Sequence, residues 1–182
     1  MKDKKLDIAT FAGGCFWCTE AIFRRLRGVG SVTPGYSGGK MENPSYEQVA
    51  AGVTGHAEAI QIEFDPLAIS FSKLLEVFFA THDPTTLNRQ GADVGSQYRS
   101  VIFYHGEKQK KLAIDFVGKL EKSKEFNQKI VTEVLPFTSF YPAEKVHKDY
   151  YEKSRGAFYC KLVIDPKIQK LYKDFSKLVK KE

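Results

Sequence analysis

Two cysteines three residues apart, Cys15 and Cys18, are the residues whose type and spacing most directly suggest chemistry. They lie in the segment Gly14-Cys15-Phe16-Trp17-Cys18, where two glycines follow a short apolar run. Glycines after a strand allow a sharp turn, and a helix starting near Cys15 would bring its positive dipole end and unpaired N–H groups to the sulfur. Both effects favour the thiolate, the nucleophilic form of cysteine. The segment therefore predicts a reactive thiol at Cys15, beside two large aromatic surfaces.

The Cys-x-x-Cys spacing is also typical of two other kinds of site. A thioredoxin-type redox pair uses it, and so does half of a zinc site. A complete zinc site needs further ligands, and the rest of the chain offers only Cys160 and four scattered histidines, His56, His82, His105 and His147. We therefore expect no metal. The structural alternative is that both cysteines and both aromatic residues are simply core, but the Gly-Gly turn and the Phe-Trp pair favour the functional interpretation.

Length and composition describe a single folded domain, which we expect to span residues 1–182. A hydrophobic content of 42% and an aromatic content of 13% are enough to bury a core, so disorder is a poor description. The net charge of +6 invites a comparison with nucleic-acid-binding proteins. No basic run is interleaved with stacking aromatic residues, so a solvated lysine-rich surface is the better interpretation and we expect no nucleic-acid partner.

The sequence carries no targeting or membrane signal that we recognise. The N-terminal residues lack an apolar core of secretory-signal length, and no segment approaches the roughly 20 apolar residues of a membrane span. Three cysteines form an odd set, which argues against a static disulfide framework and for reactive thiols. We therefore expect a cytoplasmic, soluble monomer with no membrane partner.

The clearest strand pattern runs from residue 59 to residue 64 and bears on a nearby acid. Ile60, Ile62 and Phe64 share one face, and the polar residues between them share the other. Glu58 has the parity of the apolar residues, so a longer strand would point its carboxyl towards the core. Burial would raise its pKa and keep it protonated near neutral pH. A glutamate at a strand end that reaches solvent is the alternative, and the alternation alone leaves both open.

The other expected elements follow from apolar runs and helical spacing. We expect strands at 8–12, 29–36, 100–104 and 130–135, helices starting near residue 15 and spanning 70–82 and 107–122, and a polar loop at 85–97. Ser70 is the expected N-cap of the second helix. Strands followed by helices predict an α+β fold, and we expect a two-layer α/β sandwich with a ferredoxin-like core and a mixed sheet. We expect the segment around 154–182 to be mobile.

Residues 13–17, Gly-Gly-Cys-Phe-Trp, resemble the signature of the peptide methionine sulfoxide reductase A family. The likeness continues in family order through residues 35–39, 43–49, 55–59, 82–91, 93–100 and 147–151, and ends at Tyr159-Cys160. These blocks cover most of the chain, and the ordered set is highly specific. The resemblance implies reduction of the S epimer of methionine sulfoxide, free or in oxidised proteins, with thioredoxin as external reductant and no organic cofactor.

The resemblance also implies roles for individual residues. Cys15 attacks the sulfoxide sulfur, and Glu58 is the acid that protonates the leaving oxygen. Tyr46 and Tyr98 match two tyrosines whose hydroxyls bind that oxygen. Asp93 matches an acidic residue on the polar side of the pocket, although a turn aspartate in a polar loop is its structural alternative.

Two further assignments concern the pocket walls and a neighbouring histidine. Phe16 and Trp17 would enclose the methyl group attached to the substrate sulfur. His56 is better interpreted as a structural neighbour than as a base, because the implied chemistry gives it no proton.

Attack by Cys15 leaves a sulfenic acid, with which a second thiol must condense. The resemblance implies Cys160, since the family often places a resolving cysteine near the C-terminus. Cys18 is closer in sequence, but many family members lack it, and three residues along a rigid helix its sulfur does not easily reach Cys15. We expect Cys160 to be the cysteine that resolves the sulfenic acid. Cys18 would then be a relay thiol, a backup thiol or simply a packing residue. The rival classes are a thiol peroxidase or disulfide oxidoreductase, and a metal- or RNA-binding module.

Overall fold

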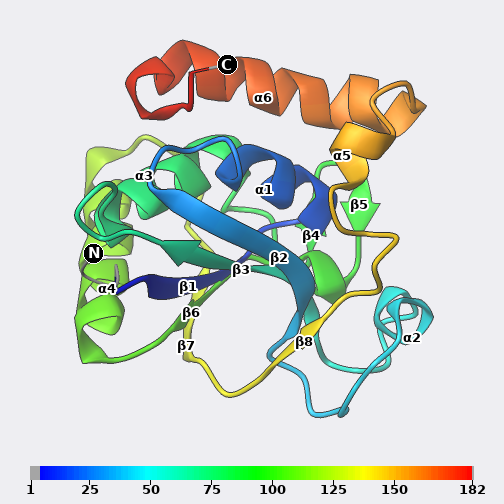
Figure 1. Ribbon diagram of the computed structural model, residues 1–182. Helices are drawn as coiled ribbons and strands as arrows, with labels where there is room; N and C mark the ends of the chain where they lie inside the picture. Colours follow the sequence, from blue (N-terminus) through cyan, green and yellow to red (C-terminus); the bar gives the residue numbers. More distant parts are fainter. Residues whose placement is uncertain (1–4, 182) are drawn as a thin grey trace.

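The chain folds around one six-stranded sheet that curls beneath a layer of helices (Figure 1). The structure is a computed structural model that describes residues 5–181; the other residues of the expected 1–182 domain lie outside the described residues. The sheet order is β7-β6-β1-β3-β2-β8, and every neighbouring pair is antiparallel except β6 and β7, which are parallel. The predicted α+β class with a mixed sheet is therefore confirmed. The strands are β1 (Asp7–Ala12), β2 (Val29–Ser37), β3 (Ala57–Phe64), β6 (Val101–Tyr104), β7 (Glu133–Pro136) and β8 (Phe140–Pro142).

The helices are α1 (Phe16–Phe23), α2 (Tyr46–Ala50), α3 (Phe71–Thr81), α4 (Glu107–Ser123), α5 (Tyr150–Lys153) and α6 (Asp165–Asp174). Short 3₁₀ turns occur at Ser96–Tyr98 and Ser176–Leu178, and a π-helical turn at Cys160–Ile164 leads into α6. A separate two-stranded hairpin consists of β4 (Arg89–Gln90) and β5 (Asp93–Val94).

The main core lies between the sheet and the helices α1 and α3. Phe11 of β1 stacks on Phe78 of α3 with ring centroids 4.9 Å apart, and both side chains are buried. Buried aromatic pairs of this kind add stability beyond the area they cover. The helix α6 lies across α1 and α3 on the side away from the sheet (Figure 1), and its Leu171 is fully buried. The site elements at the start of α1 are thus fixed between the sheet below and the C-terminal segment above.

The helix predicted at 70–82 is confirmed to within a residue at each end, and the Ser70 side chain caps it by accepting a hydrogen bond from the N–H of Lys73. The strand predicted at 130–135 begins only at Glu133, because Ile130 instead packs into the core. The polar loop expected at 85–97 contains the β4–β5 hairpin. Strands of two residues are too short to produce an alternating pattern, so the sequence did not reveal them.

The C-terminal segment around 154–181 is held against α1 and the turn that follows it. The N–H of Arg27 donates to the carbonyl of Leu178 at 2.7 Å, and the N–H of Lys180 donates to the carbonyl of Arg25 at 2.8 Å. The structure describes this docked arrangement, and the expected mobility of the segment stays a prediction. Among residues 5–181, no helix has both the length and the apolar character needed to span a lipid bilayer.

Candidate active site

Cys15 lies at the tight turn between β1 and α1, as its sequence neighbours predict. Gly14 has a φ of 89°, which glycine adopts without the strain of a side chain. Its neighbour Gly13 lies so close to α3 that a Cβ atom would come within 2.7 Å of the Phe78 ring. Cys15 follows as the N-cap residue of α1, with its side chain buried at 7% exposure. The thiol is therefore placed at the positive end of a helix by a turn that only small residues allow.

Glu58 projects from the central strand β3 onto the same turn. Its side chain is buried on the face of Ile60 and Ile62, which decides between the two alternatives that the alternation left open. Its Oε2 atom accepts a hydrogen bond of 3.0 Å from the N–H of Phe16, one of the unpaired donors at the start of α1. Burial, with a smaller contribution from the charge of Asp93, raises the pKa of Glu58 to about 8. This carboxyl therefore carries a proton at neutral pH.

The two thiols of the Cys-x-x-Cys segment are in contact with each other. The helix begins at Phe16, one residue after Cys15, so Cys15 is not held in a helical position and its thiol hydrogen-bonds to Cys18. This contact lowers the pKa of Cys18, and the charge of Lys167 contributes further. Because Cys15 precedes the helix, its backbone is less restricted than the sequence suggested, and the choice of Cys160 over Cys18 as resolving thiol stays a prediction.

Burial also changes the expected ionisation of Cys15. Burial is the largest cause that raises the pKa of the Cys15 thiol well above its usual range, and the contact with Cys18 and the charge of Glu58 act in the same direction. Burial thus opposes the effect of the helix end that the sequence predicted for this thiol, and it favours the protonated form of Cys15.

The two predicted tyrosines lie on separate elements around Glu58. Tyr46 is the first residue of α2, whose N-terminus is fixed by a reciprocal capping box between Ser45 and Gln48. Tyr98 ends the 3₁₀ turn that precedes β6. Burial and then the charge of Glu58 raise the pKa of Tyr46 to about 12 and move the pKa of Tyr98 upward as well. Both hydroxyls therefore keep their protons and can donate hydrogen bonds near the Glu58 carboxyl.

Asp93 contacts a tyrosine for which the sequence analysis assigned no role. The hydroxyl of Tyr159 donates to Oδ2 of Asp93 at 2.7 Å and lies 3.7 Å from the sulfur of Cys18. It also hydrogen-bonds to Cys15, which lowers the pKa of that thiol against the larger effect of burial. Tyr159 thus links the hairpin residue Asp93 to both thiols. The only sequence signal for this position is that it directly precedes Cys160.

Trp17 is held by two residues around the start of α5, His147 in the preceding loop and Tyr150, the first residue of the helix. Its Nε1–H donates to Nδ1 of His147 at 3.2 Å, and its ring stacks on Tyr150 with centroids 3.7 Å apart and planes 11° from parallel. The ring of the neighbouring Phe16 is fully buried and lies 6.3 Å from that of Tyr46. The predicted aromatic walls are thus present beside Cys15, and Trp17 is locked by partners that no pattern in the sequence identified.

Cys160 lies in the same apolar cluster as the two cysteines of α1. It is fully buried at the start of the π-helical turn, and the cluster also contains Ile164 and Ile168. All three cysteines are free thiols in this structure. Residues more than 140 positions apart in sequence therefore belong to one cluster, which contains all three cysteines of the chain.

His56 and His82 both make hydrogen-bond contacts with backbone groups. Nδ1 of His56 accepts from the N–H of Gly39 at 3.0 Å, and Nε2 lies 2.7 Å from the carbonyl of Met41. His82 contacts the carbonyl of Phe78 and the hydroxyl of Ser100, and burial lowers its pKa to about 4. These contacts support a structural interpretation of both residues. Within residues 5–181, no three His, Cys, Asp or Glu side chains are grouped so that they could hold a metal ion.

A buried thiol at a helix N-terminus, a protonated carboxyl bound to the same helix end and adjacent second thiols define a thiol-based redox enzyme on an α+β fold. A family model described as peptide methionine sulfoxide reductase matches residues 7–179. A peptide methionine sulfoxide reductase MsrA from Sulfolobus acidocaldarius is 57% identical over 170 residues, which cover 93% of this chain and 96% of that protein. The chain therefore belongs to the peptide methionine sulfoxide reductase family.

Solved structures agree with this assignment. The crystal structure of Mxr1 from Saccharomyces cerevisiae in reduced form is similar with a TM-score of 0.81 at 33% identity, covering 87% of this chain and 91% of that one. Mxr1 in complex with Trx2 gives a TM-score of 0.58 at 26% identity, covering 82% of this chain and 87% of that one. The lower score accompanies a form of Mxr1 bound to another protein.

Proposed function

We propose that this chain reduces the S epimer of methionine sulfoxide, free or in oxidised proteins, to methionine, and that Cys15 is the nucleophile. One arrangement carries the proposal: the Cys15 thiol and the protonated Glu58 carboxyl meet at the N-terminus of α1, where Glu58 binds the N–H of Phe16. Reduction of a sulfoxide needs a nucleophile for the sulfur and a proton for the oxygen. Both groups are present side by side, and membership of the family supports the same reaction.

The first step, transfer of the sulfoxide oxygen to Cys15, needs no reactant besides the substrate and these residues. Cys15 attacks the sulfoxide sulfur while Glu58 delivers its proton to the sulfoxide oxygen, and the proton that the Cys15 thiol loses passes to the Glu58 carboxylate, which is thereby restored. The oxygen passes to the Cys15 sulfur, which is oxidised to a sulfenic acid, and the substrate sulfur is reduced by two electrons to the thioether. Tyr46 and Tyr98 donate hydrogen bonds to the oxygen as negative charge develops on it. Asp93 holds the polar side of the pocket through its contact with Tyr159.

The methyl group of the substrate would lie against Phe16 and Trp17. A thioether and its methyl group pack favourably against aromatic rings. Trp17 is already fixed by its stacking on Tyr150, so little side-chain entropy is lost when substrate binds.

Turnover requires that the sulfenic acid be removed by a second thiol. We assign this step to Cys160, whose thiol condenses with the Cys15 sulfenic acid, releases water and forms a disulfide. Cys160 comes from a segment that we expect to move, and it shares the apolar cluster of Cys15. Cys18 remains a relay, a backup or packing, and its contact with Cys15 gives it a shorter route than the sequence suggested. Thioredoxin would reduce the disulfide, consistent with the solved complex of Mxr1 with Trx2.

Cysteine variants test this proposal in two assays. Cys15→Ser should abolish methionine formation both in a single turnover and in thioredoxin-coupled cycling. Cys160→Ser should form methionine normally in a single turnover but should lose cycling. If Cys160→Ser cycles normally while Cys18→Ser does not, Cys18 is the resolving thiol. If Cys15→Ser keeps the wild-type yield, or if the purified wild type consumes only peroxide, the proposed function is wrong.

We also propose a single catalytic domain with a ferredoxin-like core, in a monomeric and cytoplasmic protein. The first four core strands and two helices follow the order β1-α1-β2-β3-α3-β6, and the four strands lie side by side as β6-β1-β3-β2. This antiparallel arrangement supports the ferredoxin-like assignment. Three free cysteines suit a reducing compartment, where thiols stay reduced.

A further inference from the structure

Glu20, which lies on α1 three residues after Trp17, is a buried acid that the proposed reaction does not use. Its side chain is only 2% exposed, yet burial raises its pKa only to about 7, so it can ionise near neutral pH. It borders a cavity of about 260 Å³ that also contacts Arg24 and Asp149. Buried carboxyls are costly unless they make specific hydrogen bonds, so the partners of Glu20 deserve a functional explanation.

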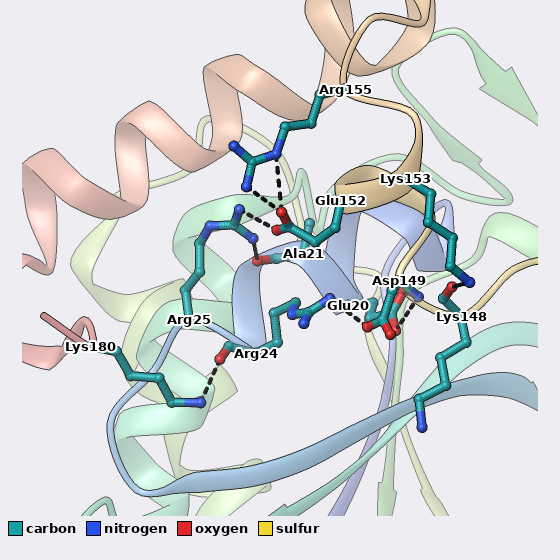
Figure 2. Close-up of polar contacts among 10 residues, drawn as sticks. All are labelled: Glu20, Ala21, Arg24, Arg25, Lys148, Asp149, Glu152, Lys153, Arg155 and Lys180. Carbon is teal, nitrogen blue, oxygen red and sulfur yellow. Dashed lines mark hydrogen bonds and ion pairs between the residues drawn. The ribbon is translucent and has the colours of Figure 1, made fainter. Parts of the chain in front are cut away.

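The partner of Glu20 is the backbone of the loop before α5. Both carboxyl oxygens lie within hydrogen-bonding distance of the N–H of Asp149, at 3.0 and 3.1 Å (Figure 2). Asp149 has a φ of 57°, in the left-handed region that residues other than glycine seldom adopt. Such a backbone persists only where its surroundings hold it. The hydrogen bond from the Asp149 N–H to the Glu20 carboxyl on α1 stabilises this backbone conformation.

A set of charged contacts surrounds this central hydrogen bond. Arg24 pairs with the Asp149 side chain, and Arg25 pairs with Glu152 at 2.7 Å (Figure 2). These pairs are partly exposed, and exposed ion pairs each contribute little. The buried contact of Glu20 is therefore the one best placed to define the backbone of the loop, with the arginines supporting it from the solvent side.

The two residues that hold Trp17 lie close to Asp149 in sequence, His147 two positions before it and Tyr150 directly after it. Tyr150 stacks on its indole ring and His147 accepts its N–H. Trp17 and Glu20 are three residues apart, so α1 presents both on neighbouring positions of one face. Glu20 thus fixes the loop, and the loop in turn fixes the tryptophan that borders Cys15.

We propose that Glu20 is a positioning residue for sulfoxide reduction: by binding the N–H of Asp149 it holds residues 147–150 in place and so sets the orientation of Trp17 in the substrate pocket. This inference rests on the proposed function, because it concerns the same pocket. Glu20 acts through the loop and touches neither the thiols nor the sulfoxide. Its removal should weaken substrate binding more than it slows the chemical step.

Trp17 is the only tryptophan of the chain, so its fluorescence reports directly on this contact. We would compare Glu20→Ala, Glu20→Gln and Lys180→Ala with the wild type, measuring tryptophan emission and single-turnover kinetics with free methionine sulfoxide. Gln keeps a carbonyl oxygen that can accept the Asp149 N–H, so it tests rescue by a conservative change. Lys180 is exposed and borders the same cavity, but its Nζ donates to the carbonyl of Arg24 and not to Asp149, so it is the control for a change at the cavity that keeps the Glu20–Asp149 contact.

Glu20→Ala should shift the tryptophan emission and raise the substrate concentration for half-maximal rate roughly 10- to 100-fold, with a much smaller change in the maximal rate. Glu20→Gln and Lys180→Ala should resemble the wild type in both readouts. Unchanged emission and unchanged half-saturation in a folded Glu20→Ala protein would overturn the proposal, as would a loss confined to the maximal rate. If Glu20→Ala does not fold, Glu20→Asp, whose shorter carboxyl reaches less far, gives the same comparison.

The two proposals fail in distinguishable ways. If the wild type forms no methionine, the proposed function fails, yet the emission shift still tests the link from Glu20 to Trp17. If the wild type forms methionine and Glu20→Ala matches it in emission and half-saturation, only the positioning role is wrong.

Discussion

Glu58 illustrates how burial sets the chemistry of a single residue. A carboxyl between apolar strand neighbours loses water, and the pKa rises to about 8 despite the hydrogen bond from the Phe16 N–H. The same burial raises the pKa of Cys15, so the nucleophile and the acid both hold protons before substrate arrives. The contact with Cys15 lowers the pKa of the neighbouring Cys18 thiol. The site therefore has two protonated groups, Glu58 and Cys15, where we propose that the sulfoxide binds.

The rate of methionine formation should depend on the protonation of Glu58. A raised pKa of about 8 keeps the acid protonated below that pH, and the proton is lost as the pH rises through 8. The single-turnover rate of the wild type should therefore fall above pH 8. Glu58→Gln cannot donate a proton, so its rate should be lower by roughly 100- to 10,000-fold and should lack this descending limb.

Glu63→Gln is the matched control for that measurement. Glu63 lies on the same strand but on the exposed face, where it accepts a hydrogen bond from Ser31. Its pH–rate profile should equal that of the wild type. A descending limb that persists near pH 8 in Glu58→Gln would show that another group supplies the proton.

At the scale of elements, the turn between β1 and α1 is what brings the thiol to its position. The turn depends on Gly14, whose φ of 89° is unfavourable for any side chain. A Cβ atom there would also lie 2.6 Å from Cγ of Gln90. Gln90 is not free to move aside, because its amide group binds the backbone of Asp83 through both its oxygen and its nitrogen.

Gly14→Ala should therefore damage both stability and activity. We expect a loss of about 1–3 kcal/mol in the free energy of unfolding, from backbone strain, and a reduction of the single-turnover rate by about tenfold or more, from displacement of Cys15. Chemical denaturation and rapid-mixing kinetics measure the two effects.

The matched substitution is Gly118→Ala in the interior of α4, where a Cβ atom would meet nothing within 4 Å. Alanine favours the helix, so this variant should gain roughly 0.5–1 kcal/mol in stability and keep its activity. Equal stability changes in the two variants would contradict the role that we assign to the turn.

At the scale of the whole molecule, the sequence predicted the residues close to the thiol better than the contacts that hold them. The β1–α1 turn and the buried parity of Glu58 follow from local patterns, since glycine position and strand alternation act over a few residues. The contacts of Tyr159 with Asp93 and of Glu20 with Asp149 join residues 66 and 129 positions apart. No local pattern encodes such contacts, and only the folded chain brings them together.

The burial of the Cys15 side chain could likewise not be predicted from the residues near it in sequence. The helix end is readable from the sequence, but the covering of the thiol comes from the C-terminal segment around Cys160, which packs in the same cluster. The raised pKa of Cys15 is thus a property of the assembled molecule. We therefore expect the C-terminal segment to move when substrate enters and when Cys160 reaches the sulfenic acid.

The most direct test of the central claim is a single turnover of the fully reduced protein without external reductant, with methionine and free thiols counted together. With the S epimer of methionine sulfoxide, the wild type should form one methionine per chain and lose two of its three thiols, with the resulting disulfide mapped to Cys15 and Cys160. The R epimer should give neither product nor thiol loss. Methionine formed from the S epimer while Cys15 stays a free thiol would contradict the account.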